Sequence, residues 1–81
     1  MRGYPSRIRK GLMDMLDAAI RAKQAERPGS DTPAARLSAA EEVWQSLTPR
    51  TRVGYLMVLY RELSKDVDDV VRCIGEEAGR A

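Results

Sequence analysis

Apolar side chains recur at intervals of three and four residues over the first third of the chain. They are Ile8, Leu12, Met15, Leu16, Ala19 and Ile20, and this spacing puts them on one stripe of an α-helix. Ser6 follows Pro5 and is a suitable N-cap, whereas residues 27–31 have the Pro-Gly-Ser composition typical of a turn. The pattern therefore predicts a helix over residues 6–26.

Two Thr-Pro pairs mark the starts of the next two helices. In Thr32-Pro33 and again in Thr48-Pro49, a capping residue precedes a proline suited to the first helical position. Residues 38–41 form a capping box and offer a second possible start for the earlier helix. One helical face then carries Leu37, Ala40, Trp44 and Leu47. We predict a helix over residues 33–47, with Trp44 in the core.

The last third of the chain carries a heptad pattern. Spacings of three and four alternate along Val53, Leu56, Tyr60, Leu63, Val67, Val70 and Ile74, as in a coiled coil. Because no proline or glycine interrupts residues 55–74, we predict one continuous helix over residues 49–78, about 45 Å long. The alternative is a break at Ser64, with Asp66, Asp68 and Asp69 in the first turns of a fourth helix, where negative charge is favourable.

The predicted fold is all-α, a small helical bundle. It is a single domain over residues 1–81, built as a helical hairpin packed on a long C-terminal amphipathic helix. A globule of this length has a radius of gyration of about 12 Å. The long helix would therefore overhang it unless a second chain covered the excess. We predict a homodimer whose heptad seam consists of Leu56, Tyr60, Leu63, Val67, Val70 and Ile74.

The run from Tyr55 to Tyr60 is apolar all round a helix, not on one stripe only. Two flanking helices cover two faces of such a segment, and the remaining apolar side needs another cover. Burial in the core of the same chain is the alternative. We favour self-association or partner binding, because Tyr and Arg are enriched in interface hot spots. The predicted interface residues are Tyr55, Val58, Leu59 and Arg61.

The formal net charge is only +2, but the charge is unevenly distributed. Basic side chains gather at the N-terminal end, and acidic ones gather near the C-terminal end. The basic patch consists of Arg2, Arg7, Arg9 and Lys10. Positive charge in the first turn of a helix opposes the helix dipole. The patch therefore either meets something anionic (nucleic acid, an acidic partner or the acidic end of this chain) or is an ordinary solvated end.

The sequence holds no histidine and a single cysteine, Cys73. An intrachain disulfide, a Cys/His zinc site and an ordinary Ser-His or Cys-His catalytic pair are therefore impossible. No phosphate-cradling glycine loop occurs, and the Asp66, Asp68 and Asp69 cluster fits a solvated helix face better than a calcium loop. We expect no metal, no cofactor and no enzymatic activity, and inert burial for Cys73.

Membrane insertion is not expected either. The longest apolar run has six residues, from Tyr55 to Tyr60, which is too short for a signal peptide or a transmembrane helix. A lone cysteine fits a reducing compartment. We therefore expect a cytoplasmic location.

Part of the sequence resembles the DNA-binding region of sigma factors and related helix-turn-helix regulators. The resemblance rests on Leu47-Thr48-Pro49-Arg50-Thr51-Arg52, on Tyr55-Leu56 and Leu63-Ser64, and on residues 68–75 as the helix before the turn. It covers about a third of the chain and implies a helical DNA-binding unit. Only six residues follow Gly75, too few for a recognition helix, so we do not assign the chain to this family.

These observations favour a non-enzymatic protein–protein interaction module: a small regulator, adaptor or inhibitor of a larger protein. The alternative is a DNA-binding transcriptional regulator that uses the basic N-terminal end. Nucleic-acid binding is not favoured, because specific binding usually needs a broader basic face. A structural assembly subunit is a third possibility, and the sequence does not identify the partner.

Overall fold

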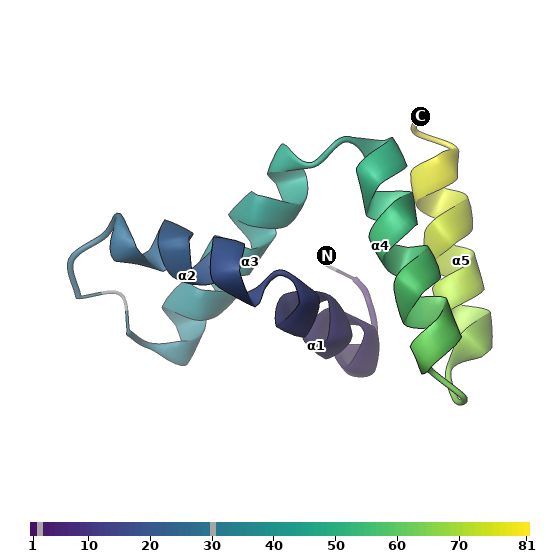
Figure 1. The fold of residues 1–81 in the computed structure, drawn as a ribbon, viewed down its shortest axis with the longest axis horizontal. Coiled ribbons are helices and arrows are strands. Elements are labelled where there is room, and N and C mark those ends of the chain that lie inside the picture. The colour runs from purple at the N-terminus through teal and green to yellow at the C-terminus, as the bar shows by residue number, and fades with distance from the viewer. Residues whose placement is uncertain (2, 30) are drawn as a thin grey trace.

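The computed structural model describes residues 1, 3–29 and 31–81. The regular secondary structure of these residues consists of α-helices. In order along the chain, they are α1 (Ser6–Met15), α2 (Asp17–Ala25), α3 (Pro33–Ser46), α4 (Pro49–Glu62) and α5 (Val67–Ala78). No strand occurs among the described residues. The all-α prediction is therefore confirmed. Figure 1 shows α4 and α5 side by side, α2 next to α3, and α1 between these two pairs.

The helix predicted over residues 6–26 is divided at Leu16. The backbone of Leu16 leaves the helical region (φ −99°, ψ 13°), although its amide still donates to the Leu12 carbonyl at 3.0 Å. On either side of the bend, α1 contacts α4 and α2 contacts α3. Leu12, Leu16 and Ile20 are all buried. The bend thus lets one apolar stripe pack against two different partners.

The starts of α3 and α4 follow the predicted caps. The hydroxyl of Thr32 accepts a hydrogen bond from the amide of Ala35 at 3.1 Å. The hydroxyl of Thr48 accepts one from the amide of Thr51 at 3.2 Å. In both helices the proline occupies the first turn, where its missing N–H leaves no bond unmade. The second possible start, at the capping box, is not used.

The continuous helix predicted over residues 49–78 is not formed, and the alternative break is observed. The chain leaves the helix at Leu63 (ψ 119°), bends through residues 64–65 and enters α5 from Asp66 in the left-handed conformation (φ 63°). Asp68 and Asp69 then occupy the first turn of α5, where the helix dipole favours negative charge. The reversal folds the heptad seam back on itself, and Leu56 and Val70 are buried within one chain.

The core lies where α1, α3, α4 and α5 meet. Its largest fully buried side chain is Trp44, as predicted, at 1% exposed. It also includes residues from the N-terminal segment and from all five helices: Met1, Tyr4, Ile8, Leu12, Leu16, Ile20, Ala39, Ala40, Leu56, Leu59, Val70 and Cys73. Leu37, predicted on the same face as Trp44, is instead 50% exposed. The inward face of α3 runs through Ala39, Ala40 and Trp44.

Candidate functional site

A groove lies between the C-terminal half of α4 and the middle of α5. Five residues line it, and we call this site the α4–α5 groove: Met57, Tyr60, Arg61, Val71 and Ile74. Its volume is about 430 Å³. The inner side of the same two helices supplies Leu56, Leu59, Val70 and Cys73 to the core. The pair therefore also carries apolar residues outside the core, around this groove.

Exposed hydrophobic side chains are concentrated on these two helices. Five large hydrophobic residues are exposed in the described chain, and four of them are Met57, Val58, Tyr60 and Val71. Their exposed fractions run from 44% for Val58 to 51% for Val71. Single exposed apolar residues are ordinary on protein surfaces, whereas a contiguous group indicates a binding surface. The grouping therefore makes this face the leading candidate for a functional site.

The residue types in the α4–α5 groove are those of protein interfaces. Tyr, Met and Arg are enriched in interface cores, whereas Lys, Glu, Asp, Ser and Ala are depleted. The lining contains Tyr60, Met57 and Arg61, and no residue of a depleted type. Arg61 forms no ion pair with any described residue. The groove therefore presents one unpaired cation at the edge of an apolar surface.

A second, shallower hollow lies further round α4. Its lining residues are Thr51, Gly54, Tyr55 and Val58, and its volume is about 320 Å³. A Cβ atom added to Gly54 would meet nothing within 4 Å, so the backbone of α4 is open to an approaching group there. Val58 follows Met57 on α4 and points about 100° further round the helix, so this hollow opens on a different side of α4 from the groove.

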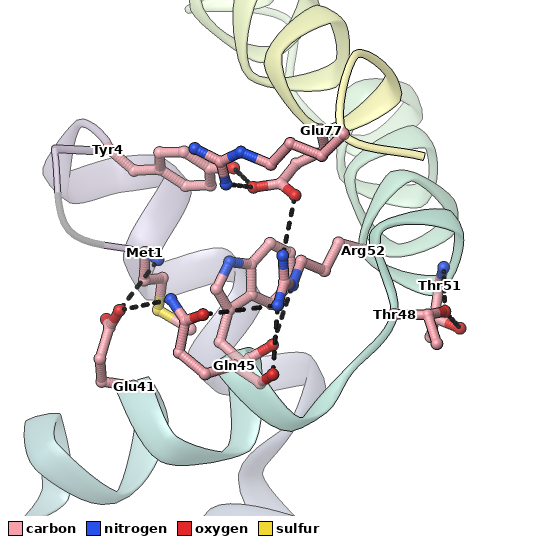
Figure 2. A network of polar contacts seen from close by, with 10 residues as sticks. Met1, Tyr4, Glu41, Gln45, Thr48, Thr51, Arg52 and Glu77 are labelled. Atoms are coloured by element: carbon pink, nitrogen blue, oxygen red, sulfur yellow. Dashed lines mark hydrogen bonds and ion pairs between the residues drawn. The ribbon is translucent and has the colours of Figure 1, made fainter.

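Behind this surface, a buried carboxylate ties the end of α5 to the rest of the molecule. Glu77 is 1% exposed. Its Oε1 accepts hydrogen bonds from the Tyr4 hydroxyl at 2.9 Å and from Arg80 at 2.8 Å. Its Oε2 accepts from Nη1 of Arg52 at 3.1 Å (Figure 2). Both carboxylate oxygens therefore have donors, as a buried charge requires.

Arg52 connects this carboxylate to the end of α3. Its Nε donates to the Trp44 carbonyl at 3.0 Å, and its Nη2 donates to the Gln45 carbonyl at 3.2 Å. These carbonyls belong to the last turn of α3, where few intrahelical donors remain; the Trp44 carbonyl also accepts from the amide of Leu47 at 3.2 Å. The guanidinium also lies 6.0 Å from the centre of the Trp44 ring, and Tyr4 meets the same ring edge-on at 6.1 Å. One side chain thus joins α3, α4 and α5.

Burial changes the acid–base behaviour of three groups near this network. Burial, with the hydrogen bond to Glu77, raises the pKa of Tyr4 well above its ordinary value of 10.0. Burial also raises the pKa of the Cys73 thiol, and nearby Glu76 adds to this effect. The N-terminal ammonium of Met1 lies 3.4 Å from Glu41, yet burial lowers its pKa. At neutral pH the phenol and the thiol are therefore protonated, which stabilises packing and does not create a nucleophile.

The basic patch is partly engaged within the chain. Arg7 pairs with Asp66 at 3.4 Å, so the structure realises one contact between the basic end and the acidic end. Arg9 is half-buried and its Nη2 donates to the hydroxyl of Ser6 at 3.4 Å, whereas Lys10 is exposed. Arg2 lies outside the described residues. The predicted patch is therefore not a uniform cationic face.

The predicted interface residues fall in three different places. Arg61 lines the α4–α5 groove, and Tyr55 and Val58 line the neighbouring hollow. Leu59 does not belong with them, because it is only 2% exposed. It packs so closely on α1 that a Cβ atom at Gly11 would lie 2.5 Å from its Cδ1. Leu59 is therefore a core residue, and its place in the predicted interface is corrected.

The heptad seam is divided between the inside and the outside of the chain. Leu56 and Val70 are fully buried, and Leu63 and Val67 are half-buried beside the bend. Tyr60 and Ile74 line the α4–α5 groove. The overhanging helix that motivated the predicted dimer is absent, because the reversal at residues 63–66 lets the chain cover part of its own seam. Homodimerisation itself remains a prediction.

Sequence reasoning missed four residues that matter here. Arg52 and Glu77 have helical spacing with buried residues, at positions 52, 56 and 59 and at positions 70, 73 and 77, but a charged residue is not expected in a buried stripe. Met57 was within the predicted apolar run, yet was not singled out. Val71 lies outside the heptad pattern that includes Val70, and its part in a groove depends on how α5 packs against α4.

Within the described part of the chain, no group of three or more His, Cys, Asp or Glu residues is placed to hold a metal ion. Among the same residues, no helix combines the length and the hydropathy that crossing a bilayer requires. Comparison of the chain with protein-family models, curated proteins and solved structures found no match. The case for function therefore rests on the surface itself.

Proposed function

We propose that this chain is a non-enzymatic protein-interaction module, a small regulator, adaptor or inhibitor, and that it binds another protein through the α4–α5 groove. The observation that carries the proposal is the grouping of exposed Met57, Tyr60 and Val71 around one groove that also contains Arg61. Pockets for catalysis need converging polar groups, whereas this groove is lined by apolar side chains and one arginine.

The size of the apolar surface supports this function. Met57, Tyr60 and Val71 are each about half exposed, and a half-exposed aromatic side chain alone leaves on the order of 100 Å² in water. The largest apolar patch of a typical monomer is about 300–600 Å² and is often functional. A standard interface buries about 800 Å² on each partner, and somewhat more than half of that area is apolar. A group of three such side chains around one groove is suited to be the apolar centre of an ordinary interface.

The buried network supports the same function from the inner side. Arg52 and Glu77 join the start of α4 to the end of α5, and Leu63 to Asp66 closes the other end of the pair. Both walls of the groove are thus held in position before anything binds. Preorganisation of this kind reduces the conformational entropy that binding costs.

Site-specific photo-crosslinking in the source cell tests the proposal. A photoreactive residue replaces Met57 in one variant and Leu37 in another; both positions are about half exposed, and Leu37 lies on α3, away from the groove. We expect a discrete light-dependent product from position 57 that disappears when Val71→Asp is added, and no such product from position 37. The same products from both positions, or none from position 57, would contradict the proposal.

DNA binding by the basic N-terminal end is the alternative, and the side-chain contacts support it less. Arg7 is paired with Asp66, and Arg52, part of the segment that resembles sigma factors, is buried against Glu77. If DNA nevertheless binds tightly at physiological salt, the affinity should fall steeply with added salt and with Lys10→Ala. That result would favour the DNA-binding transcriptional regulator over the protein-interaction module.

A further inference from the structure

We infer that the occupant of the α4–α5 groove is an amphipathic α-helix of a different protein, with an apolar stripe and a carboxylate that pairs with Arg61. This inference rests on the proposed function and specifies the partner's chemistry. It combines the shape of the groove, the hydrogen-bonding state of its walls and the unpaired charge of Arg61.

The walls of the groove favour a helix over an extended segment. Both walls are α-helices, so their backbone N–H and C=O groups bond internally and offer no ladder to a strand. An extended chain buried in such a groove would leave its own backbone groups unpaired, at a cost of roughly 1–3 kcal/mol each. A helix satisfies its backbone internally and presents only side chains, which is the helix-in-groove mode of recognition.

The dimensions set the length of the occupant. The lining residues span positions 57–61 of α4 and 71–74 of α5, which is slightly more than one turn of each helix. A partner helix of about two turns is enough to cover this stretch. Its anchors at positions i, i+3 or i+4, and i+7 would pack between Met57 and Tyr60 on α4 and Val71 and Ile74 on α5. The partner helix would then lie over the α4–α5 pair.

The charge of the groove argues for a different protein over a second copy. A two-fold symmetric dimer pairs the same patch with itself. Two copies joined through this groove would bring both Arg61 side chains to one desolvated surface, and no lining residue carries a carboxylate. A helix that places Asp or Glu beside its apolar stripe would instead pair with Arg61, with the geometry that a guanidinium favours.

A displayed library of 18-residue helical peptides tests this inference. The peptides are randomised on one face with all residue types, selected on the full chain, and counter-selected on the Met57→Asp variant. Selected peptides are then measured by titration against the wild-type chain, Arg61→Glu and Arg50→Glu. Arg50 is an exposed arginine of α4 outside the groove lining and serves as the matched control. Circular dichroism verifies that each variant is folded.

We expect the selected peptides to carry apolar residues at helical spacing and an acidic residue beside that stripe. Arg61→Glu should weaken binding about tenfold, Arg50→Glu should leave it within about twofold, and changing the acidic residue of the peptide to Lys should restore binding to Arg61→Glu. Peptides that need Met57 but are indifferent to Arg61 would overturn the inference and leave the proposed function standing. If binding of no peptide depends on Met57, both the inference and the proposed function fail.

Self-association is measured alongside. Sedimentation equilibrium of the wild-type chain and of Val71→Asp decides whether the groove pairs with its own copy. A monomer at micromolar concentration agrees with the inference. A dimer that dissociates in Val71→Asp would overturn the assignment to a different protein, because the groove would then be occupied by a second copy.

Discussion

Arg52 and Glu77 form a buried ion pair between the first turn of α4 and the last turn of α5, with 3.1 Å between Nη1 and Oε2. The two residues are 25 positions apart. The side chain of Arg52 is 9% exposed, and that of Glu77 is 1% exposed. Because Arg52 also holds the last carbonyls of α3, this pair fixes how the α4–α5 pair sits on the rest of the chain. It is the polar centre of an otherwise apolar core.

We expect Glu77→Leu to lower the free energy of unfolding by about 3–5 kcal/mol, because it leaves the Arg52 guanidinium buried without its counter-ion. The double change Arg52→Met with Glu77→Leu removes both charges. It should therefore lower the free energy of unfolding by less than Glu77→Leu alone. Urea denaturation at pH 7 measures both. Equal loss in the single and double variants would mean that the carboxylate's other contacts, to Tyr4 and Arg80, dominate.

Alkaline pH should weaken the fold through Tyr4. Burial and Glu77 raise the pKa of Tyr4 in the folded chain above its ordinary value of 10.0, so folding favours the protonated phenol. This contribution is fully present below about pH 10 and is lost as the pH rises from there toward the folded-state pKa. Urea denaturation between pH 8 and pH 11 should show a decline that is less steep in Tyr4→Phe. Parallel declines in the two proteins would show that Tyr4 does not carry the effect.

Val58 and Leu59 are neighbours on α4 with opposite surroundings, at 44% and 2% exposed. We expect Leu59→Ala to lower the free energy of unfolding by about 2–5 kcal/mol, because it leaves a cavity against α1. Val58→Ala, the matched control, should change it by no more than about 0.5 kcal/mol. Thermal and urea denaturation measure both. A similar loss at the two positions would contradict the packing described for α4.

The turn between α4 and α5 depends on a strained residue. Asp66 has φ 63°, a conformation that costs an ordinary residue about 1–2 kcal/mol and glycine almost nothing. Asp66→Gly should therefore be more stable than Asp66→Ala by about 1 kcal/mol. Both variants lose the carboxylate that meets Arg7, so their difference isolates the backbone term. If alanine were the more stable residue, a helix continuing through residues 63–66 would be the better description.

Local signals in the sequence determined the helical class and several boundaries. The caps at Thr32 and Thr48 act within one turn of their own backbone, so they can be predicted from the local sequence alone. Trp44 was predicted in the core because its helical neighbours are apolar. The excess of apolar residues between Tyr55 and Tyr60 was also visible, and with it the expectation that α4 has more apolar surface than one partner can cover.

Only the tertiary structure decided which stripe of α4 faces inward. The sequence favoured the heptad seam through Val53, Leu56 and Tyr60, whereas the buried stripe passes through Arg52, Leu56 and Leu59. An arginine can be buried only where a carboxylate meets it, and its carboxylate, Glu77, reaches Arg52 because the chain reverses at residues 63–66. The sequence held both the break and the continuous helix as possibilities. Long-range burial selected the break, and that choice left Met57, Tyr60 and Val71 together on the outside.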